Sequence, residues 1–224
     1  MACGPPLRRY QDWISGAEQS GQVVRVDEVV LRTAVRQLAR WRHRSPTAGR
    51  LHMAVNVSGR TLVEPGLDET VLRTLREEGL PPHRLLLEVT EGVLLEQEAA
   101  VATLQRLRAA GVRIALDDFG TGWSSLTYLR RFPVDVLKLD RTFTSGLGQG
   151  GAADAVPAAV LQLASALELD VVAEGVEEPA QAEALRALGC RLAQGWLFGR
   201  AEPADCLEPT VVRAPLALAP AVGR

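Results

Sequence analysis

The chain has 224 residues, a length that allows one large domain with a buried core. Only 4% of the residues are aromatic and the formal net charge is −2, which argues against a base-stacking groove and against electrostatic attraction to DNA. No apolar run approaches the ~20 residues that a membrane span needs. Cys3, Cys190 and Cys206 share no CxxC spacing, which favours a reduced, cytoplasmic protein without a zinc site.

Short aliphatic runs alternate with stretches of helical period along the chain. We expect strands at 51–57, 84–90, 112–117, 134–140, 170–174 and 191–194. We expect helices at 23–43, 67–79, 95–110, 123–131, 155–168 and 178–188, with Pro157 in the first turn of its helix. Near-continuous apolar strands that alternate with helices indicate a parallel sheet covered by helices.

This α/β pattern predicts a (β/α)8 TIM-barrel-like fold that is incomplete, with about six of the eight strands. The predicted domain covers 16–205 and follows an irregular segment at 1–15. The remaining residues, 206–224, are rich in Ala and Pro, so we expect a disordered tail.

Polar side chains end the predicted strands. In chain order they are Asn56, Glu88, Asp117 with Asp118, Lys138 with Asp140, Glu174 and Gln194. The carboxyl ends of barrel strands meet at one rim, so we expect these side chains to converge there. Hard oxygen ligands of this kind suit Mg²⁺ or Mn²⁺, and two such ions sharing Asp117 could act on a phosphoryl group. Lys138 would then orient or deprotonate water, or stabilise charge on a phosphate.

Six motifs carry a resemblance to a known family. They are NVS at 56–58, EVTE at 88–91, DDFGTGWSSL at 117–126, LKLD at 137–140, VVAEGVE at 171–177 and QGWLFGR at 194–200. From about Gly16 to Pro203 the chain resembles the EAL domain family, the cyclic di-GMP phosphodiesterases of bacterial signalling. The resemblance implies a modified barrel that uses two metal ions to hydrolyse cyclic di-GMP to linear pGpG.

The resemblance also implies residue roles. The metal ligands would be Asn56, Glu88, Asp117, Asp118 and Glu174. Lys138 would position or activate water, and Glu177 and Gln194 would support it. Asp140 and Phe198 would contact the substrate. Glu91 would anchor a loop of Phe119, Gly120, Thr121 and Gly122 that leads to the face of a homodimer.

The sequence departs from the family at its start. No Glu-Ala-Leu triplet precedes the matching motifs, although the family takes a metal ligand from that strand. We therefore expect weaker metal binding near Asn56, Glu88 and Asp117, and little phosphodiesterase activity from this chain alone. Thr61 stands where the family often has Gln, which would weaken a substrate contact.

Three other interpretations stay open. The chain could be a degenerate EAL module that binds a nucleotide or a protein partner without hydrolysis. It could be an unrelated metal-dependent barrel enzyme. The carboxylates could also be helix caps, a role that Asp and Asn often have after strands and that fits Asp118 as well as metal binding does.

Overall fold

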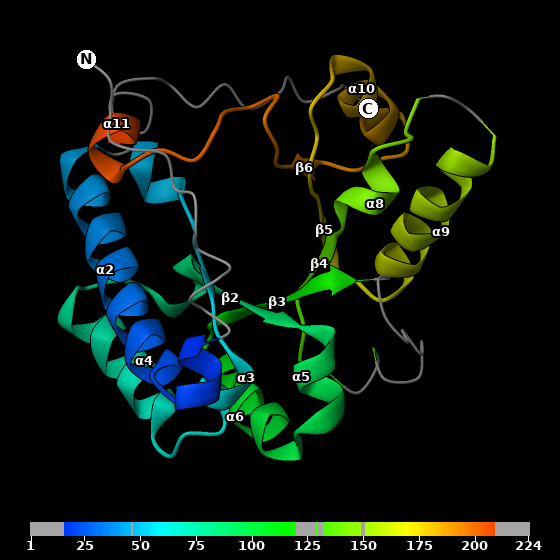
Figure 1. Cartoon of the computed structure of the whole chain (residues 1–224). Helices are drawn as coiled ribbons and strands as arrows, with labels where there is room; N and C mark the ends of the chain where they lie inside the picture. Colours follow the sequence, from blue (N-terminus) through cyan, green and yellow to red (C-terminus); the bar gives the residue numbers. More distant parts are fainter. Residues whose placement is uncertain (1–15, 46, 120–128, 130–131, 149–150, 209–224) are drawn as a thin grey trace.

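A single curled sheet forms the centre of the molecule. The computed structural model describes residues 16–45, 47–119, 129, 132–148 and 151–208. Its six strands are β1 (Met53–Asn56), β2 (Leu85–Thr90), β3 (Arg113–Phe119), β4 (Val136–Leu139), β5 (Asp170–Ala173) and β6 (Leu192–Ala193). Neighbours in sequence are neighbours in the sheet, and every pair is parallel. Among the described residues the curl does not close, so β1 and β6 are free edges of a half-barrel (Figure 1).

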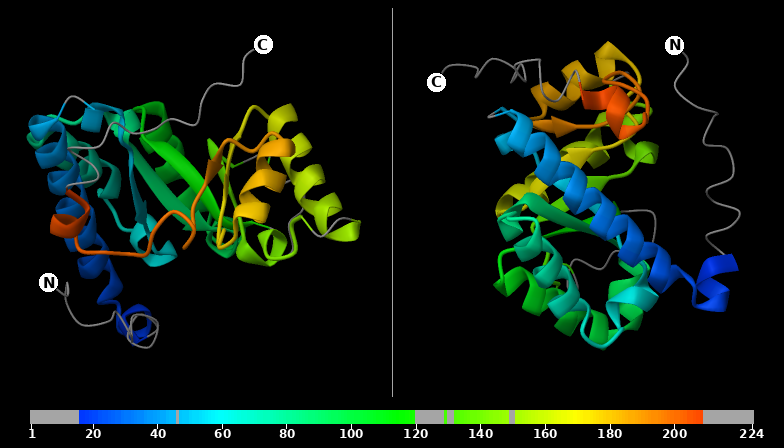
Figure 2. Two further views of the ribbon diagram at one scale, coloured as in Figure 1. Left: turned by 90° about the horizontal axis from the view of Figure 1, so that it is seen from above. Right: turned by 90° about the vertical axis from the view of Figure 1, so that its left-hand side faces the viewer.

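Helices lie outside the curl, as the views in Figure 2 show. The longer ones are α2 (Val23–Arg44), α4 (Leu67–Glu77), α6 (Glu98–Ala109), α9 (Ala152–Ala166) and α10 (Pro179–Ala187). The short ones are η1 (Thr47–Arg50), α3 (Gly59–Leu62), η2 (Pro82–Arg84), α5 (Glu91–Glu96), α8 (Arg141–Thr144) and α11 (Ala204–Glu208). No described helix has both the length and the apolarity to cross a bilayer.

The core forms where the sheet meets α2, α4 and α6. Leu38, Leu75 and Leu104 on these helices pack in one buried cluster with Leu87 of β2 and Ile114 of β3. Each of these side chains is almost fully removed from water, which is worth roughly 1.5–3 kcal/mol per residue relative to exposure. The strands are therefore held at a fixed register, and their carboxyl ends are presented at one rim.

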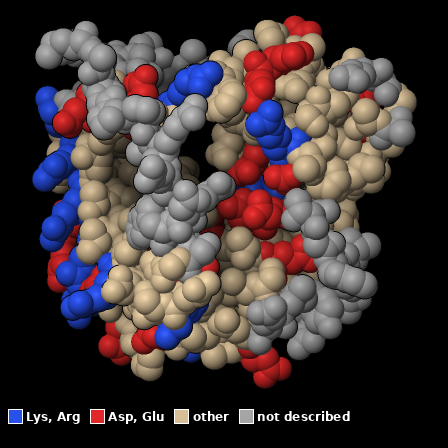
Figure 3. Space-filling view, in the orientation of Figure 1, with Lys and Arg blue, Asp and Glu red and all other residues tan. Residues whose placement is uncertain are grey.

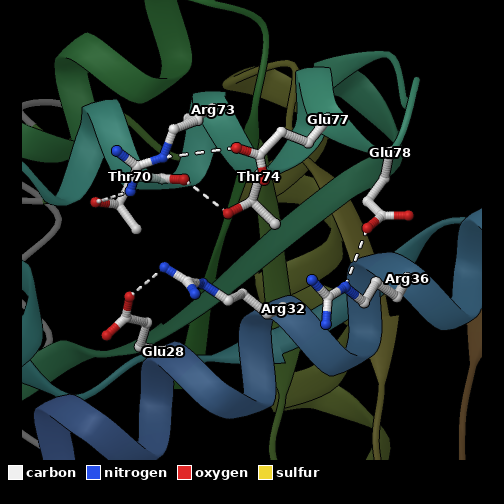
Figure 4. Close-up of polar contacts among 8 residues, drawn as sticks. All are labelled: Glu28, Arg32, Arg36, Thr70, Arg73, Thr74, Glu77 and Glu78. Atoms are coloured by element: carbon white, nitrogen blue, oxygen red, sulfur yellow. Dashed lines mark hydrogen bonds and ion pairs between the residues drawn. The ribbon is translucent and has the colours of Figure 1, made fainter.

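Ion pairs cover the outer surface of α2 and α4. Arg36 Nε on α2 contacts Glu78 Oε1 just after α4 at 3.0 Å, and Arg32 pairs with Glu28 one turn earlier at 2.6 Å (Figure 4). These side chains are between about a quarter and three-fifths exposed, so each pair contributes less than about 1 kcal/mol to stability.

The expected six-stranded, incomplete barrel is confirmed, and the differences are local. The helix expected at 95–110 begins at Glu98, after the separate α5. The helix expected at 155–168 begins at Ala152, so Pro157 lies inside α9 and not in its first turn. Its start is set by Gly151, at φ 70°, and by Asp154, which accepts the N–H of Gly148. Except for Leu129, the helix expected at 123–131 lies outside the described residues.

The segment after β6 crosses to the other side of the molecule. Figures 1 and 2 show it running from β6 toward the side formed by α2, where it ends in α11. Helix α11 extends to Glu208 and so reaches into the segment 206–224 that was expected to be a tail. Cys206 in α11 is disulfide-bonded, whereas Cys190 is a free thiol, so the expectation that all thiols are reduced is wrong.

Candidate metal and catalytic site

The parallel register brings the polar strand ends together. Asn56 at the end of β1 is paired in register with Glu88 of β2, and Thr90 of β2 with Asp117 of β3. Lys138 lies in β4 beside Val172 of β5, and Glu174 directly follows β5. The expected convergence at one rim is therefore present for Glu88, Asp117, Lys138 and Glu174, whose side chains contact one another.

Lys138 is the centre of the site. Its Nζ lies 2.9 Å from Glu88 Oε2, 3.1 Å from Asp117 Oδ1 and 2.6 Å from Glu174 Oε1. The lysine side chain is only 6% exposed. Burial opposes its charge, but hydrogen bonds to Glu174 and Glu88 outweigh burial and raise the pKa of Lys138. In this arrangement the side chain is an ammonium ion, which can orient water or a phosphate but does not accept a proton.

Glu174 is held from two sides. The oxygen that contacts Lys138 also accepts a hydrogen bond of 2.7 Å from Gln194 Nε2. Gln194 is fixed in turn by the pairing of β5 and β6, where its N–H donates to the carbonyl of Ala173. Burial raises the pKa of Glu174, and the nearby Asp117 and Glu88 add to this effect against the opposing influence of Lys138. One ammonium does not neutralise three carboxylates, so the cluster holds more acidic groups than basic ones.

A bulge in β3 sets the direction of the two consecutive aspartates. The pairing of β3 with β4 shifts register between Leu116 and Phe119, and Asp118 has a left-handed backbone with φ 55°. Consecutive residues of a regular strand point to opposite faces, and a bulge changes that alternation. Burial, followed by the charges of Asp117 and Asp140, raises the pKa of Asp118, so the three carboxylates influence one another.

Asp140 caps a helix. It is the N-cap of α8, and its Oδ1 accepts the N–H of Thr142 at 2.9 Å. Burial opposes its ionisation, but hydrogen bonds from Thr142 and Arg141 outweigh burial and lower the pKa of Asp140. The capping interpretation therefore holds for Asp140, whose predicted contact with substrate remains a prediction.

Other predicted residues lie around the cluster. Glu177 Oε1 pairs with Arg141 at 3.1 Å. Glu91 begins α5 and is buried, and Phe198 is 60% exposed after β6. Phe119 ends β3 with its ring in the core, so its expected place in a loop is wrong. Gly120, Thr121 and Gly122 lie outside the described residues.

The donor chemistry suits a hard divalent cation, although the side chains are arranged around the lysine. No group of three or more His, Cys, Asp or Glu in the described part of the chain has a geometry ready to hold a metal ion. The carboxylates nevertheless converge on one point, and oxygen donors of this kind are those that Mg²⁺ and Mn²⁺ prefer. On the face shown in Figure 3, acidic side chains gather beside the hollow between the two halves of the molecule, and basic ones follow the side formed by α2.

Sequence reasoning missed three features of this rim. It did not single out Arg141, which pairs with Glu177, or Asp27 on α2, which binds the turn after β1. It also overlooked that Lys138 is the only lysine in the sequence, whereas the other 24 of the 25 Lys and Arg residues are arginines. That count could have drawn attention to position 138, because it is the one basic position that is not an arginine.

Known proteins of one family share this sequence and fold. Residues 8–201 match the model of the EAL domain. The bifunctional diguanylate cyclase/cyclic di-GMP phosphodiesterase MucR of Pseudomonas aeruginosa is 41% identical over 196 residues, which are 87% of this chain and 28% of MucR. The chain spans only about a quarter of the length, 26–28%, of the first curated relatives that it matches.

Two solved structures extend the likeness. The PaMucR phosphodiesterase in complex with c-di-GMP has a TM-score of 0.81 and 40% identity, covering 88% of this chain and 79% of that one. Klebsiella pneumoniae BlrP1 in a manganese and cyclic di-GMP complex has a TM-score of 0.72 and 32% identity, covering 79% of this chain and 44% of that one.

Proposed function

Because the chain belongs to the EAL domain family, we propose that it is a module of cyclic di-GMP signalling that binds this nucleotide with Mg²⁺ or Mn²⁺ at the carboxyl rim. The observation that carries the proposal is the convergence of Glu88, Asp117 and Glu174 on Lys138. Similar proteins support it, since MucR is named as a cyclic di-GMP phosphodiesterase and BlrP1 is described with manganese and the nucleotide.

Each residue of the rim has a proposed task. The metal ligands are Asn56, Glu88, Asp117, Asp118 and Glu174. A bound divalent cation polarises a phosphoryl oxygen as a Lewis acid. Lys138 places positive charge beside the same carboxylates, where it can orient water or a phosphate, and Gln194 fixes Glu174. Three further residues surround the position of the substrate: Asp140, the exposed Phe198, and Glu177, which pairs with Arg141.

Hydrolysis to linear pGpG is proposed to be slow or absent in this chain alone. The described half-barrel leaves β1 and β6 unpaired, so one side of the site lacks a neighbouring strand. A second candidate is a module that binds a nucleotide or a protein without hydrolysis. Three large apolar side chains favour it, because Leu192 of β6 and Trp196 and Phe198 after β6 are 48–60% exposed, and a partner could cover them.

Calorimetry and product analysis separate these candidates. We expect cyclic di-GMP to bind the 224-residue chain in Mn²⁺ or Mg²⁺, with little pGpG detected by chromatography. Glu174→Gln should weaken binding at least about tenfold, since it removes a charged ligand. Asp170→Asn is the matched control, because Asp170 lies at the opposite end of β5 and pairs with Arg113. No binding with either metal, or equal binding by Glu174→Gln, would contradict the proposal.

Assembly and location are further proposals. A homodimer would form on the side of residues 119–122, with Glu91 at the base of that loop, and light scattering at several protein concentrations would test it. We also propose that the domain covers 16–205 and works in the cytoplasm, although Cys206 is disulfide-bonded. The composition gives no reason to expect DNA binding, because the net charge is −2.

A further inference from the structure

Lys138 joins three strands through one atom. Its Nζ contacts Glu88 of β2, Asp117 of β3 and Glu174 after β5 at 2.6–3.1 Å. An ammonium group has three N–H donors, so three carboxylates can engage all of them. All four side chains are at least four-fifths buried, the most exposed being Glu174 at 17%. The lysine is therefore the hub that holds the carboxylates at one point.

The cluster carries more negative charge than the lysine offsets. Three carboxylates and one ammonium leave a net charge of about −2 in a poorly solvated space, where like charges repel strongly. A divalent cation would balance that charge, but it binds carboxylate oxygens at about 2.0–2.6 Å. A cation at that distance from the same three oxygens would fall on or beside Nζ. The ammonium and the metal ion therefore compete for one position.

The amino-acid composition sets position 138 apart from every other basic position. Every other Lys or Arg position in the chain is Arg, and only position 138 is Lys. A guanidinium presents its donors as a planar fork, whereas an ammonium is a compact charge on a flexible stem. A compact charge can face three strands at once and can also retract along its own stem.

We propose that Lys138 is a built-in counterion that keeps Glu88, Asp117 and Glu174 converged, and that its ammonium withdraws from at least one of them when a divalent cation binds. This inference rests on the metal-binding part of the proposed function and does not depend on hydrolysis. Lys138 would therefore have two effects. Its charge competes with the metal ion for one position, and in the absence of metal it keeps the three carboxylates close together.

The single lysine makes a direct test possible. Protein with isotope-labelled lysine gives one side-chain signal, which needs no assignment by mutagenesis. In chelator, the signal should differ from that of free lysine and should move in Glu174→Gln, because one acceptor has become neutral. Saturating Mg²⁺, followed in parallel by calorimetry, should shift the wild-type signal. A signal that stays constant while Mg²⁺ binds would overturn the exchange.

The Lys138→Met variant tests the same idea, because it should lower thermal stability and at the same time strengthen Mg²⁺ binding. In chelator its Tm should fall by on the order of 10 °C, because three buried carboxylates lose their counterion. Its Mg²⁺ dissociation constant should nevertheless be lower than that of the wild type, by about tenfold or more, since the competing charge is gone. A residue with a merely supporting role would weaken metal binding on removal, and that result would overturn the inference.

Controls separate the two proposals. Arg113→Met removes a cation that pairs with Asp170 at the far end of the sheet, and it should leave Mg²⁺ affinity unchanged. If neither the wild type nor any variant binds Mg²⁺, the proposed function fails, and so does the proposed withdrawal of the ammonium on metal binding. The lysine signal in chelator still decides whether Lys138 holds the three carboxylates together. If Lys138→Met does not fold even in Mg²⁺, the wild-type signal alone decides the exchange.

Discussion

The carboxylate of Asp27 accepts hydrogen bonds from both the N–H and the hydroxyl of Ser58, at 2.9 and 2.7 Å. Thr61 donates a third hydrogen bond of 2.6 Å to the same oxygen. Ser58 is the N-cap of α3 and comes two residues after Asn56, so helix α2 fixes the turn that follows β1. Thr61 is 3% exposed, and its hydroxyl is used in this contact within the fold.

Asp27→Ala should therefore destabilise the protein. It leaves the buried hydroxyl of Thr61 and the N–H of Ser58 without their acceptor, at a cost of about 1–3 kcal/mol. For a chain of this size each kcal/mol lowers Tm by about 2–4 °C, which differential scanning calorimetry resolves. Glu28→Ala is the control, because its pair with Arg32 is exposed and its loss should cost less than about 0.5 kcal/mol. Equal effects of the two changes would show that the Asp27 contacts are not formed.

Gln194→Ala should weaken metal binding without unfolding the protein. The amide of Gln194 fixes the Glu174 oxygen that faces Lys138, and losing such a supporting group typically costs about 10–100-fold in metal affinity. Calorimetric titration with Mn²⁺ measures this. Gln105→Ala on the outer surface of α6 is the control and should bind as the wild type does. A Gln194→Ala protein with unchanged affinity would contradict the placement of Gln194.

Gly195→Ala should be far more damaging than Gly199→Ala. The two glycines have nearly the same φ, 155° and 156°, but a Cβ on Gly195 would lie 2.2 Å from the carbonyl oxygen of Val176. Nothing lies within 4 Å of a Cβ on Gly199. We expect a cost of about 3 kcal/mol or more at Gly195 and about 1–2 kcal/mol at Gly199. Urea unfolding of both variants checks the difference, and similar midpoints would contradict it.

Asp68 should contribute a pH-dependent part of the stability. The Arg106 guanidinium, which hydrogen-bonds to Asp68 at 2.6 Å, lowers the pKa of that carboxyl below its ordinary value of 3.8. A lowered pKa in the folded state means that the stabilisation is complete above the ordinary value and is lost as pH falls through the folded value. Asp68→Asn should reduce the unfolding free energy at pH 7 by less than about 1 kcal/mol, because Arg106 is exposed. Urea unfolding from pH 7 to pH 3 should show the two proteins converging at the acid end. A constant difference would contradict this origin.

The alternation of strands and helices was enough to predict the half-barrel, because each strand is a short apolar run bounded by turn residues. The rim was also predictable, since Glu88, Lys138 and Glu174 end such runs. Their mutual contacts were not, because the distances from Lys138 to three strands depend on how far the sheet curls. The bulge at Asp118 had no sequence signal either, since Asp enters a left-handed conformation only where its surroundings require it.

Other misses arose where tertiary contacts override local preference. Pro157 is typical of a first helical turn, yet α9 begins at Ala152. Trp196 has a side chain of a kind that usually packs inside, but it is 56% exposed and stacks with Arg200, whose guanidinium carbon lies 4.3 Å from the ring centre. Asp27 was unremarkable in the sequence because its partners are 31 and 34 residues away.

Within the described residues the sheet has two unpaired edges that differ from each other, and this difference has a consequence for concentrated solutions. One edge is β1 and the other is β6, and all strands run in the same direction. If the β6 edge of one molecule meets the β1 edge of the next, the contact is head-to-tail, so every addition regenerates a vacant end. Such growth has no built-in stop, and chains that join in this way would form linear polymers in preference to pairs.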